Sequence, residues 1–210
     1  MFSIKQIPEP IIGLKFRPSL EPEHSDDTDF CGEFYRPVPR EFSRENQEVL
    51  RHCLLQVPDA HCIVEIGVQR NPPPESSTAI LLQNKPPAAA YIGVDIEDKS
   101  HIADPVAGIF TLKMDSSDRF KVFALMDQLN LAWIDFLFID GWHSVRQCLA
   151  DWQYIERLSP QGIVLLHDTN VHPGPVALFD AIDERLFDKT KHCTGEDDWG
   201  IAVIRRRNKQ

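Results

Sequence analysis

Trp133-Ile-Asp-Phe-Leu-Phe-Ile-Asp-Gly-Trp-His143 is the segment on which the interpretation of this chain depends. Residues 134–139 are apolar except for Asp135, which is typical of a strand buried in the middle of a sheet. The carboxylate of Asp140 and the imidazole of His143 then follow directly after the strand. Groups that can exchange protons, placed where a buried strand ends, indicate a functional site.

A second segment with the same organisation lies downstream. Gly162-Ile-Val-Leu-Leu-His-Asp-Thr-Asn170 is an apolar run that ends in His167 and Asp168. Successive side chains of a strand point to opposite faces of a sheet. We therefore expect His167 to point away from Asp168 and to have a structural role.

From residue 61 onward, short apolar runs alternate with amphipathic segments. The expected strands are 62–66, 91–95, 109–114, 134–139 and 163–166, followed by a hairpin of about 188–193 and 199–204. The expected helices are 44–57, 78–83 (capped by Ser76 or Ser77), 118–130 (with Phe120, Phe123 and Ala124 inward), 144–158 and one around 176–186. This alternation predicts a doubly wound α/β domain with a mostly parallel sheet.

The first 43 residues differ in character from the rest. They are rich in proline and acidic residues, a composition that disfavours helices and strands. We expect residues 1–43 to form an N-terminal arm or a lid on the substrate side, and residues 44–210 to form one domain.

Composition argues against several classes of function. A net charge of −10 disfavours nucleic-acid partners. No apolar run approaches the roughly 20 residues of a membrane helix, and the first residues lack the pattern of a secretory signal. The five cysteines are scattered without CxxC spacing, which suits a reducing environment and predicts a cytoplasmic protein.

Acidic residues stand at or just after each expected parallel strand, namely Glu65, Asp95, Asp115, Asp140 and Asp168. In open α/β sheets, ligands bind outside the carboxyl ends of the strands. A single acid there is often only a turn or a helix cap. The recurrence of acids at successive strand ends favours a binding site.

The first turn discriminates between cofactors. Glu65-Ile-Gly67-Val-Gln-Arg-Asn71 contains one glycine, whereas a dinucleotide pyrophosphate requires G-x-G-x-x-G. A ligand with ribose hydroxyls and a positive centre, but without phosphates, fits better. Asp95 is placed to accept hydrogen bonds from two ribose hydroxyls, and S-adenosyl-L-methionine meets this description.

Five motifs and the terminal hairpin resemble the class I S-adenosylmethionine-dependent methyltransferases. The motifs are Glu65-Ile-Gly67, Gly93-Val-Asp95, Met114-Asp115-Ser116, Ile139-Asp140-Gly-Trp-His143 and Leu166-His-Asp168. The chain is most similar to the methyltransferase-24 type, which is related to macrocin and catechol O-methyltransferases. The resemblance spans about residues 45–204. It implies a Rossmann-like, seven-stranded sheet of order 3-2-1-4-5-7-6 with the last strand antiparallel.

The resemblance also implies roles for single residues. Asp95 would hold the ribose, Asp115 and Ser116 would flank the adenine, and Glu65 and Gly67 would line the methionine end. The full set of implied cofactor contacts is Glu65, Gly67, Val68, Asp95, Ile96, Asp115, Ser116 and Asp140.

In catechol-type enzymes, acids at the positions of Asp140 and Asp168 bind a divalent metal, usually Mg²⁺. Their third ligand directly follows the second acid, and here that residue is Thr169. His143 falls where those enzymes carry a catalytic lysine. The resemblance thus implies catalysis by His143 and Asp140, with Mg²⁺ held by Asp140, Asp168 and Thr169. Such a cation would lower the pKa of an acceptor hydroxyl, and the imidazole would take its proton.

We therefore expect methyl transfer from S-adenosylmethionine to a hydroxyl of a small molecule, with metal assistance. One alternative is a cephalosporin-hydroxylase-like metal enzyme on the same fold. Another is a relative that binds the cofactor without turnover, because Pro72-Pro-Pro74 and Thr169 depart from the usual pattern. Nucleic-acid and membrane partners are not expected, and a homo-oligomer remains open.

Overall fold

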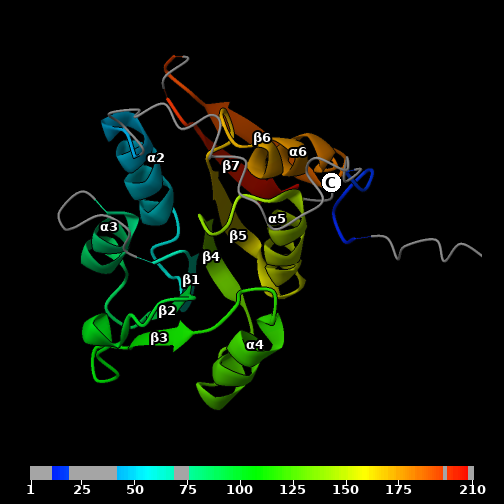
Figure 1. Ribbon diagram of the computed structural model, residues 1–210. Coiled ribbons are helices and arrows are strands. Elements are labelled where there is room, and N and C mark those ends of the chain that lie inside the picture. Colours follow the sequence, from blue (N-terminus) through cyan, green and yellow to red (C-terminus); the bar gives the residue numbers. More distant parts are fainter. Residues whose placement is uncertain (1–10, 19–41, 69–75, 196–197, 208–210) are drawn as a thin grey trace, which may run out of the picture.

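A seven-stranded sheet forms the centre of the molecule in the computed structural model, which describes residues 11–18, 42–68, 76–195 and 198–207 (Figure 1). The strands are β1 (Cys62–Ile66), β2 (Ala90–Asp95), β3 (Ile109–Lys113), β4 (Ile134–Ile139), β5 (Leu158–His167), β6 (Phe187–His192) and β7 (Ile201–Arg206). Their order is β3-β2-β1-β4-β5-β7-β6. β7 runs antiparallel to both of its neighbours, and the other pairs are parallel. The predicted fold class and strand order are confirmed.

Helices cover both faces of this sheet. They are α2 (Arg44–Leu55), α3 (Ser77–Asn84), α4 (Arg119–Gln128), α5 (Val145–Trp152) and α6 (Pro173–Ala181), with short 3₁₀ segments η2 (Ser100–Ile102) and η3 (Gln153–Arg157). Buried residues of α2 and α3 form one apolar cluster, and those of α4, α5 and α6 form the other. In β4, Phe136 and Phe138 join the first cluster, whereas Leu137 and Ile139 join the second. The central strand is therefore buried on both faces, as its apolar sequence predicts.

Three of the described helices have a serine as their N-cap residue. The side chains of Ser43, Ser76 and Ser144 accept hydrogen bonds from the first turns of α2, α3 and α5. Such caps satisfy backbone N–H groups that have no partner within the helix. Of the two serines expected to cap α3, Ser76 is the one that does so.

The boundary between α5 and β5 differs from the prediction. The α-helix ends at Trp152, η3 follows, and β5 already begins at Leu158. Leu158 pairs with Ile134, and the register then shifts before Phe136 pairs with Ile163. Pairing with β4 thus extends β5 over residues 158–162, which the prediction left outside the strand of 163–166.

The buried face of α4 was also predicted incorrectly in part. Phe123 is buried as expected, together with Val122 and Met126. Phe120 and Ala124, however, are exposed, Phe120 to 62%, and the guanidinium of Arg119 lies 4.4 Å from the centre of the Phe120 ring. A surface cation–π contact accommodates this ring without burial.

Within the expected arm of residues 1–43, the structure describes residues 11–18 and the last two residues. Leu14 pairs with Ile182 in a short bridge, and the indole Nε1 of Trp152 donates to the carbonyl of Ile12 at 2.8 Å. This segment therefore lies against the C-terminal ends of α5 and α6. Residues 19–41 lie outside the described residues, so the lid remains a prediction. No helix in the described part of the chain is long and apolar enough to span a membrane.

The turn after β1 brings two strand ends into direct contact. Gly67 has a φ of +86°, and a Cβ added to it would lie 2.0 Å from the carbonyl oxygen of Asp140. On either side, Gly67 N–H donates to Val94 and Asp140 N–H donates to Ile66, both at 2.9 Å. Only glycine fits both the conformation and the space.

Gly67→Ala should therefore lower the free energy of unfolding by about 2 kcal/mol or more, through backbone strain and steric clash. Gly195→Ala is the matched control, because nothing lies within 4 Å of a Cβ added there. Urea unfolding of both variants measures the difference. A Gly67→Ala protein as stable as the wild type would contradict this close approach.

Candidate active site

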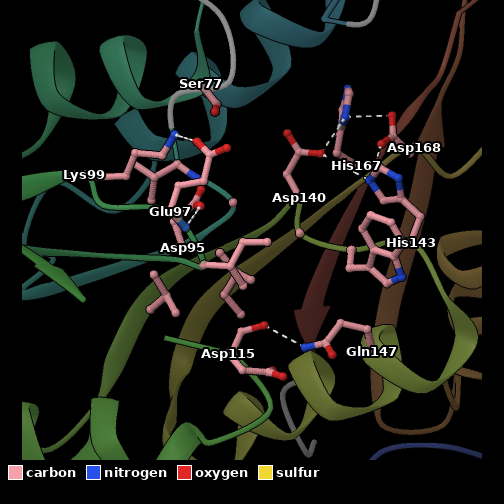
Figure 2. Close-up of a pocket in the computed structure, with 18 of the residues that line it drawn as sticks. Ser77, Asp95, Glu97, Lys99, Asp115, Asp140, His143, Gln147, His167 and Asp168 are labelled. Carbon is pink, nitrogen blue, oxygen red and sulfur yellow. Dashed lines mark hydrogen bonds and ion pairs between the residues drawn. The ribbon is translucent and has the colours of Figure 1, made fainter. Parts of the chain in front are cut away.

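A cavity of about 740 Å³ opens at the carboxyl ends of the parallel strands, within the usual size range of small-molecule sites (Figure 2). Its walls are formed mainly by 66–68, 94–97, 114–116, 140–143 and 167–168, with Phe42, Ser76, Ser77, Lys99, Gln147 and Trp199. The turns after β1 to β5 thus converge here, as expected for an open α/β sheet. All of the predicted cofactor residues line this cavity except Glu65.

Glu65 lies beneath the cavity and is fully buried. Its carboxylate accepts hydrogen bonds from Ser77 Oγ at 2.6 Å, from Thr78 Oγ1 at 2.8 Å and from the hydroxyl of Tyr91. Burial raises the pKa of Glu65 to about 7, although these hydroxyls favour the charged form. Glu65 therefore ties α3 and β2 to β1, and its contact with the cofactor remains a prediction.

Asp95 is held in place at the end of β2. Its Oδ2 accepts from the N–H of Val68 and its Oδ1 from the N–H of Glu97, both at 2.8 Å. A carboxylate offers about four acceptor positions, so each oxygen can accept a further hydrogen bond. The arrangement presents a fixed pair of acceptors to the cavity.

Lys99 was not identified from the sequence. Its Nζ lies 2.8 Å from Oε2 of Glu97, and the lysine side chain is only 10% exposed. Both residues line the cavity near Asp95 (Figure 2). A lysine in a surface loop carries no sequence signal that distinguishes it from a solvated residue.

On the other side of the cavity, two acids and two histidines form one cluster, with Asp140 facing Asp95 across the opening (Figure 2). His143 Nε2 lies 2.7 Å from Asp168 Oδ2 and 3.9 Å from Asp140 Oδ1. His167 Nδ1 lies 3.1 Å from Asp140 Oδ1 and 2.9 Å from Asp168 Oδ1. The structure therefore brings together both predicted catalytic residues, His143 and Asp140, and the predicted metal ligand Asp168.

The prediction that His167 points away from Asp168 is wrong. Asp168 has a φ of +61°, a left-handed conformation that is uncommon for residues other than glycine. This backbone ends the alternation of side chains at the end of β5. Both side chains consequently reach the cavity, where His167 joins the two carboxylates.

Mutual attraction dominates the ionisation of this buried pair. Burial alone would lower the pKa of His167, but the carboxylates of Asp168 and Asp140 outweigh it and raise that pKa to about 10. Burial also opposes ionisation of Asp168, yet the charges of His167 and His143 hold its pKa well below the usual range. The pair is therefore ionised near neutral pH.

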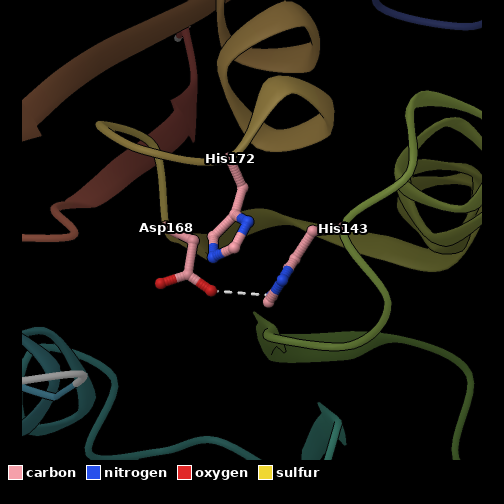
Figure 3. A group of neighbouring side chains, drawn as sticks. All are labelled: His143, Asp168 and His172. Atoms are coloured by element: carbon pink, nitrogen blue, oxygen red, sulfur yellow. Dashed lines mark ion pairs between the residues drawn. The ribbon is translucent and has the colours of Figure 1, made fainter. Parts of the chain in front are cut away.

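His172 packs against His143, and Trp199 packs against His172. The rings of His143 and His172 are stacked, with centres 4.2 Å apart and planes inclined by 28° (Figure 3). The ring of Trp199 meets that of His172 edge-on at 5.1 Å. The sequence pattern did not identify either residue, because both approach His143 only in the folded chain.

Two sets of side chains in the described residues could hold a metal ion. They are Asp140, His167 and Asp168, and His143, Asp168 and His172. Thr169, the predicted third ligand, directly follows Asp168. It is fully buried, does not line the cavity, and its Oγ1 lies 3.2 Å from a Cβ added at Gly200. Its role as a metal ligand stays a prediction.

Residues 75–169 match the model of the methyltransferase-24 family, described as a methyltransferase domain. The match covers 95 of the 210 residues. It confirms the predicted resemblance to the methyltransferases of this family, and no curated protein matches the chain.

Several solved structures share the fold of this chain. The MycE methyltransferase of the mycinamycin biosynthetic pathway, in complex with Mg, SAH and mycinamycin VI, aligns with a TM-score of 0.57 at 19% identity, covering 89% of this chain and 55% of MycE. TomG from Streptomyces achromogenes is an O-methyltransferase involved in tomaymycin synthesis and was solved with SAM. It aligns with a TM-score of 0.56 at 15% identity, covering 94% of this chain and 93% of TomG. An O-methyltransferase from Bacillus cereus in complex with SAH aligns with a TM-score of 0.55 at 14% identity, covering 81% of this chain and 85% of that enzyme. The chain thus spans about half the length of MycE.

The stability of the protein should include a pH-dependent contribution from Glu65. Folding raises this carboxyl's pKa from 4.5 to about 7, so the folded state binds more protons between these values. The contribution of Glu65 to stability should therefore fall by about 3 kcal/mol as pH rises through this window, and this contribution should be level above it. Glu65→Gln removes this dependence.

Urea unfolding at pH 5 and pH 8 tests this expectation. The variant should gain stability relative to the wild type between these two values, whereas Glu45→Gln on the exposed face of α2 should not. A difference between Glu65→Gln and wild type that is the same at both pH values would contradict the raised pKa.

Proposed function

We propose that this methyltransferase domain binds S-adenosylmethionine and transfers its methyl group to a hydroxyl of a small molecule. One observation carries the proposal. A single cavity has Asp95, with both carboxylate oxygens oriented by backbone N–H groups, on one side and the acid–histidine cluster on the other. A cofactor and an acceptor could therefore meet between them, near Asp140.

The first half of the cavity supports the cofactor. The oriented carboxylate of Asp95 suits the two ribose hydroxyls, and apolar Ile96 and Met114 flank it. The described part of the turn after β1 has no second glycine to approach a pyrophosphate. MycE and TomG, which share this fold, were solved with SAH or SAM, and this supports the same cofactor here. Residues 72–74 lie outside the described residues, so the effect of the triple proline remains a prediction.

The second half of the cavity supports proton removal from the acceptor. Methyl transfer from a sulfonium needs a hydroxyl that loses its proton as it attacks. We assign the base to His143 and the orientation of the hydroxyl to Asp140, whose side chain is 25% exposed at the cavity. His143 Nε2 lies 2.7 Å from Asp168 Oδ2, and an ionised carboxylate can only accept, so Nε2 carries a hydrogen and Nδ1 is the nitrogen that would take the proton. Asp168 would stabilise the imidazolium that results.

Metal assistance is a second candidate, supported by the proximity of Asp140, His167 and Asp168. Two carboxylates and one imidazole suit a divalent transition metal, whereas Mg²⁺ prefers oxygen ligands. Binding would require His167 to release its proton, because only the neutral imidazole is a ligand. A cation bound there would lower the pKa of the acceptor hydroxyl. These three residues would hold it, in place of the predicted set with Thr169.

Calorimetric titration tests the cofactor. The wild type should bind S-adenosylmethionine but not NAD. Asp95→Ala should weaken binding at least about 100-fold, because two hydrogen bonds to a charged group are lost. Asp98→Ala is the matched control, since Asp98 lies in the same loop and accepts from Ser100 N–H outside the cavity. Absence of S-adenosylmethionine binding in the wild type would refute the proposal.

Transfer of a labelled methyl group to a panel of phenols and alcohols tests the acceptor chemistry. His143→Ala should retain cofactor binding and slow transfer about 100-fold or more. His192→Ala, at an exposed position of β6, should leave transfer unchanged. Equal rates for His143→Ala and the wild type would remove His143 as the base. Loss of transfer in EDTA, with recovery in Mn²⁺ or Mg²⁺, would establish metal assistance, and EDTA-resistant transfer would exclude it.

A further inference from the structure

Gln147 lies on the wall of the cavity in the first turn of α5. Its backbone N–H donates to the capping Ser144 Oγ at 3.1 Å, so the helix start fixes its position. Figure 2 shows Gln147 at the same wall as Asp115. The acid–histidine cluster described above does not involve Gln147.

Both hydrogens of the Gln147 amide are already used. Its Nε2 donates to Ser116 Oγ at 2.7 Å and to Asp151 Oδ1 at 2.9 Å. An ionised carboxylate can only accept, so above the pKa of Asp151 the amide cannot reverse without turning its oxygen toward that carboxylate. Among the described residues, none donates a hydrogen bond to Gln147 Oε1. The side chain therefore presents an acceptor at the cavity wall.

Asp151 is a buried acid whose carboxylate accepts a hydrogen bond from the Gln147 amide. Its side chain is fully buried within α5, and burial raises its pKa to about 7. A buried carboxyl is costly unless it is hydrogen-bonded, and Asp151 receives its bonds from Gln147 and Ser116. Asp151 thus holds the orientation of Gln147 from beneath.

The chain geometry relates this acceptor to Asp95. Ile96 follows Asp95 directly, and the N–H of Met114 donates to the carbonyl of Asp95 at 2.8 Å. A planar base attached to a ribose at Asp95 would lie against Ile96 and Met114. Beyond Met114 the same wall continues to Ser116 and Gln147.

We propose that Gln147 Oε1 accepts a hydrogen bond from the exocyclic amine of adenine, and that Asp151 positions it to do so. The inference rests on the proposed cofactor and adds the group that distinguishes adenine from other purines. Hypoxanthine carries an oxygen in place of that amine. Two acceptors would then face each other, and a site built for a hydrogen bond strongly rejects a ligand that cannot make it.

Calorimetric titration with S-adenosylhomocysteine and S-inosylhomocysteine tests this inference. The wild type should bind the adenosyl compound about 100-fold more tightly. Gln147→Met keeps the side-chain volume, removes the acceptor and should reduce the preference to a few-fold. Asp151→Asn should also reduce it, because Gln147 could then reverse and donate to the hypoxanthine oxygen. Gln153→Ala, near the end of α5 and outside the cavity, should retain the full preference.

The outcomes separate the two proposals. Equal binding of both compounds by the wild type, or an unchanged preference in folded Gln147→Met and Asp151→Asn, would overturn this inference alone. Binding of neither compound by the wild type would refute the proposed cofactor, and the inference would fall with it. Thermal unfolding monitored by circular dichroism establishes that each variant is folded.

Discussion

The close approach of β1 and β4 at Gly67 and Asp140 is the constraint on which the site depends. No side chain fits between these two strand ends, because a Cβ at Gly67 would lie 2.0 Å from the carbonyl of Asp140. The hydrogen bonds of Gly67 to Val94 and of Asp140 to Ile66 extend the register across three strands. Asp95 and Asp140 therefore face one cavity, because the backbone that carries them is locked together.

Buried charge is handled differently in the core and at the cavity. Glu65 and Asp151 are fully buried, and their pKa values of about 7 reflect burial without a cationic partner. Hydroxyl donors bind the carboxylate of Glu65 and an amide donor binds Oδ1 of Asp151, so the two acids join elements and orient neighbours. Asp168 instead is paired with His143 and His167 and remains ionised. Glu65 and Asp151 therefore belong to the scaffold, whereas Asp168 and its two histidines are suited to proton transfer.

The neighbouring structures share the scaffold, and specific chemistry lies in the residues placed on it. At 19% identity or less, MycE, TomG and the Bacillus cereus enzyme establish the fold. In this chain the side chains of His167 and His172 lie next to Asp168, so the cluster offers nitrogen ligands, whereas Mg²⁺ prefers oxygen ligands. The adenine-side wall likewise depends on Gln147 and Asp151, which lie within one helix turn of each other.

Much of the architecture was predictable from the sequence by itself. Apolar runs such as 134–139 identify the buried strands, and single signals such as Ser76 and Gly67 mark a cap and a tight turn, because these are local properties of the chain. The order of the strands followed from the resemblance carried by their terminal acids. Only the tertiary structure decided the boundary of β5, the exposure of Phe120, the turn of His167 into the cavity and the absence of Thr169 from the cavity wall. Those outcomes depend on pairing between distant strands and on one left-handed residue, Asp168, which the pattern of side chains along the sequence does not encode.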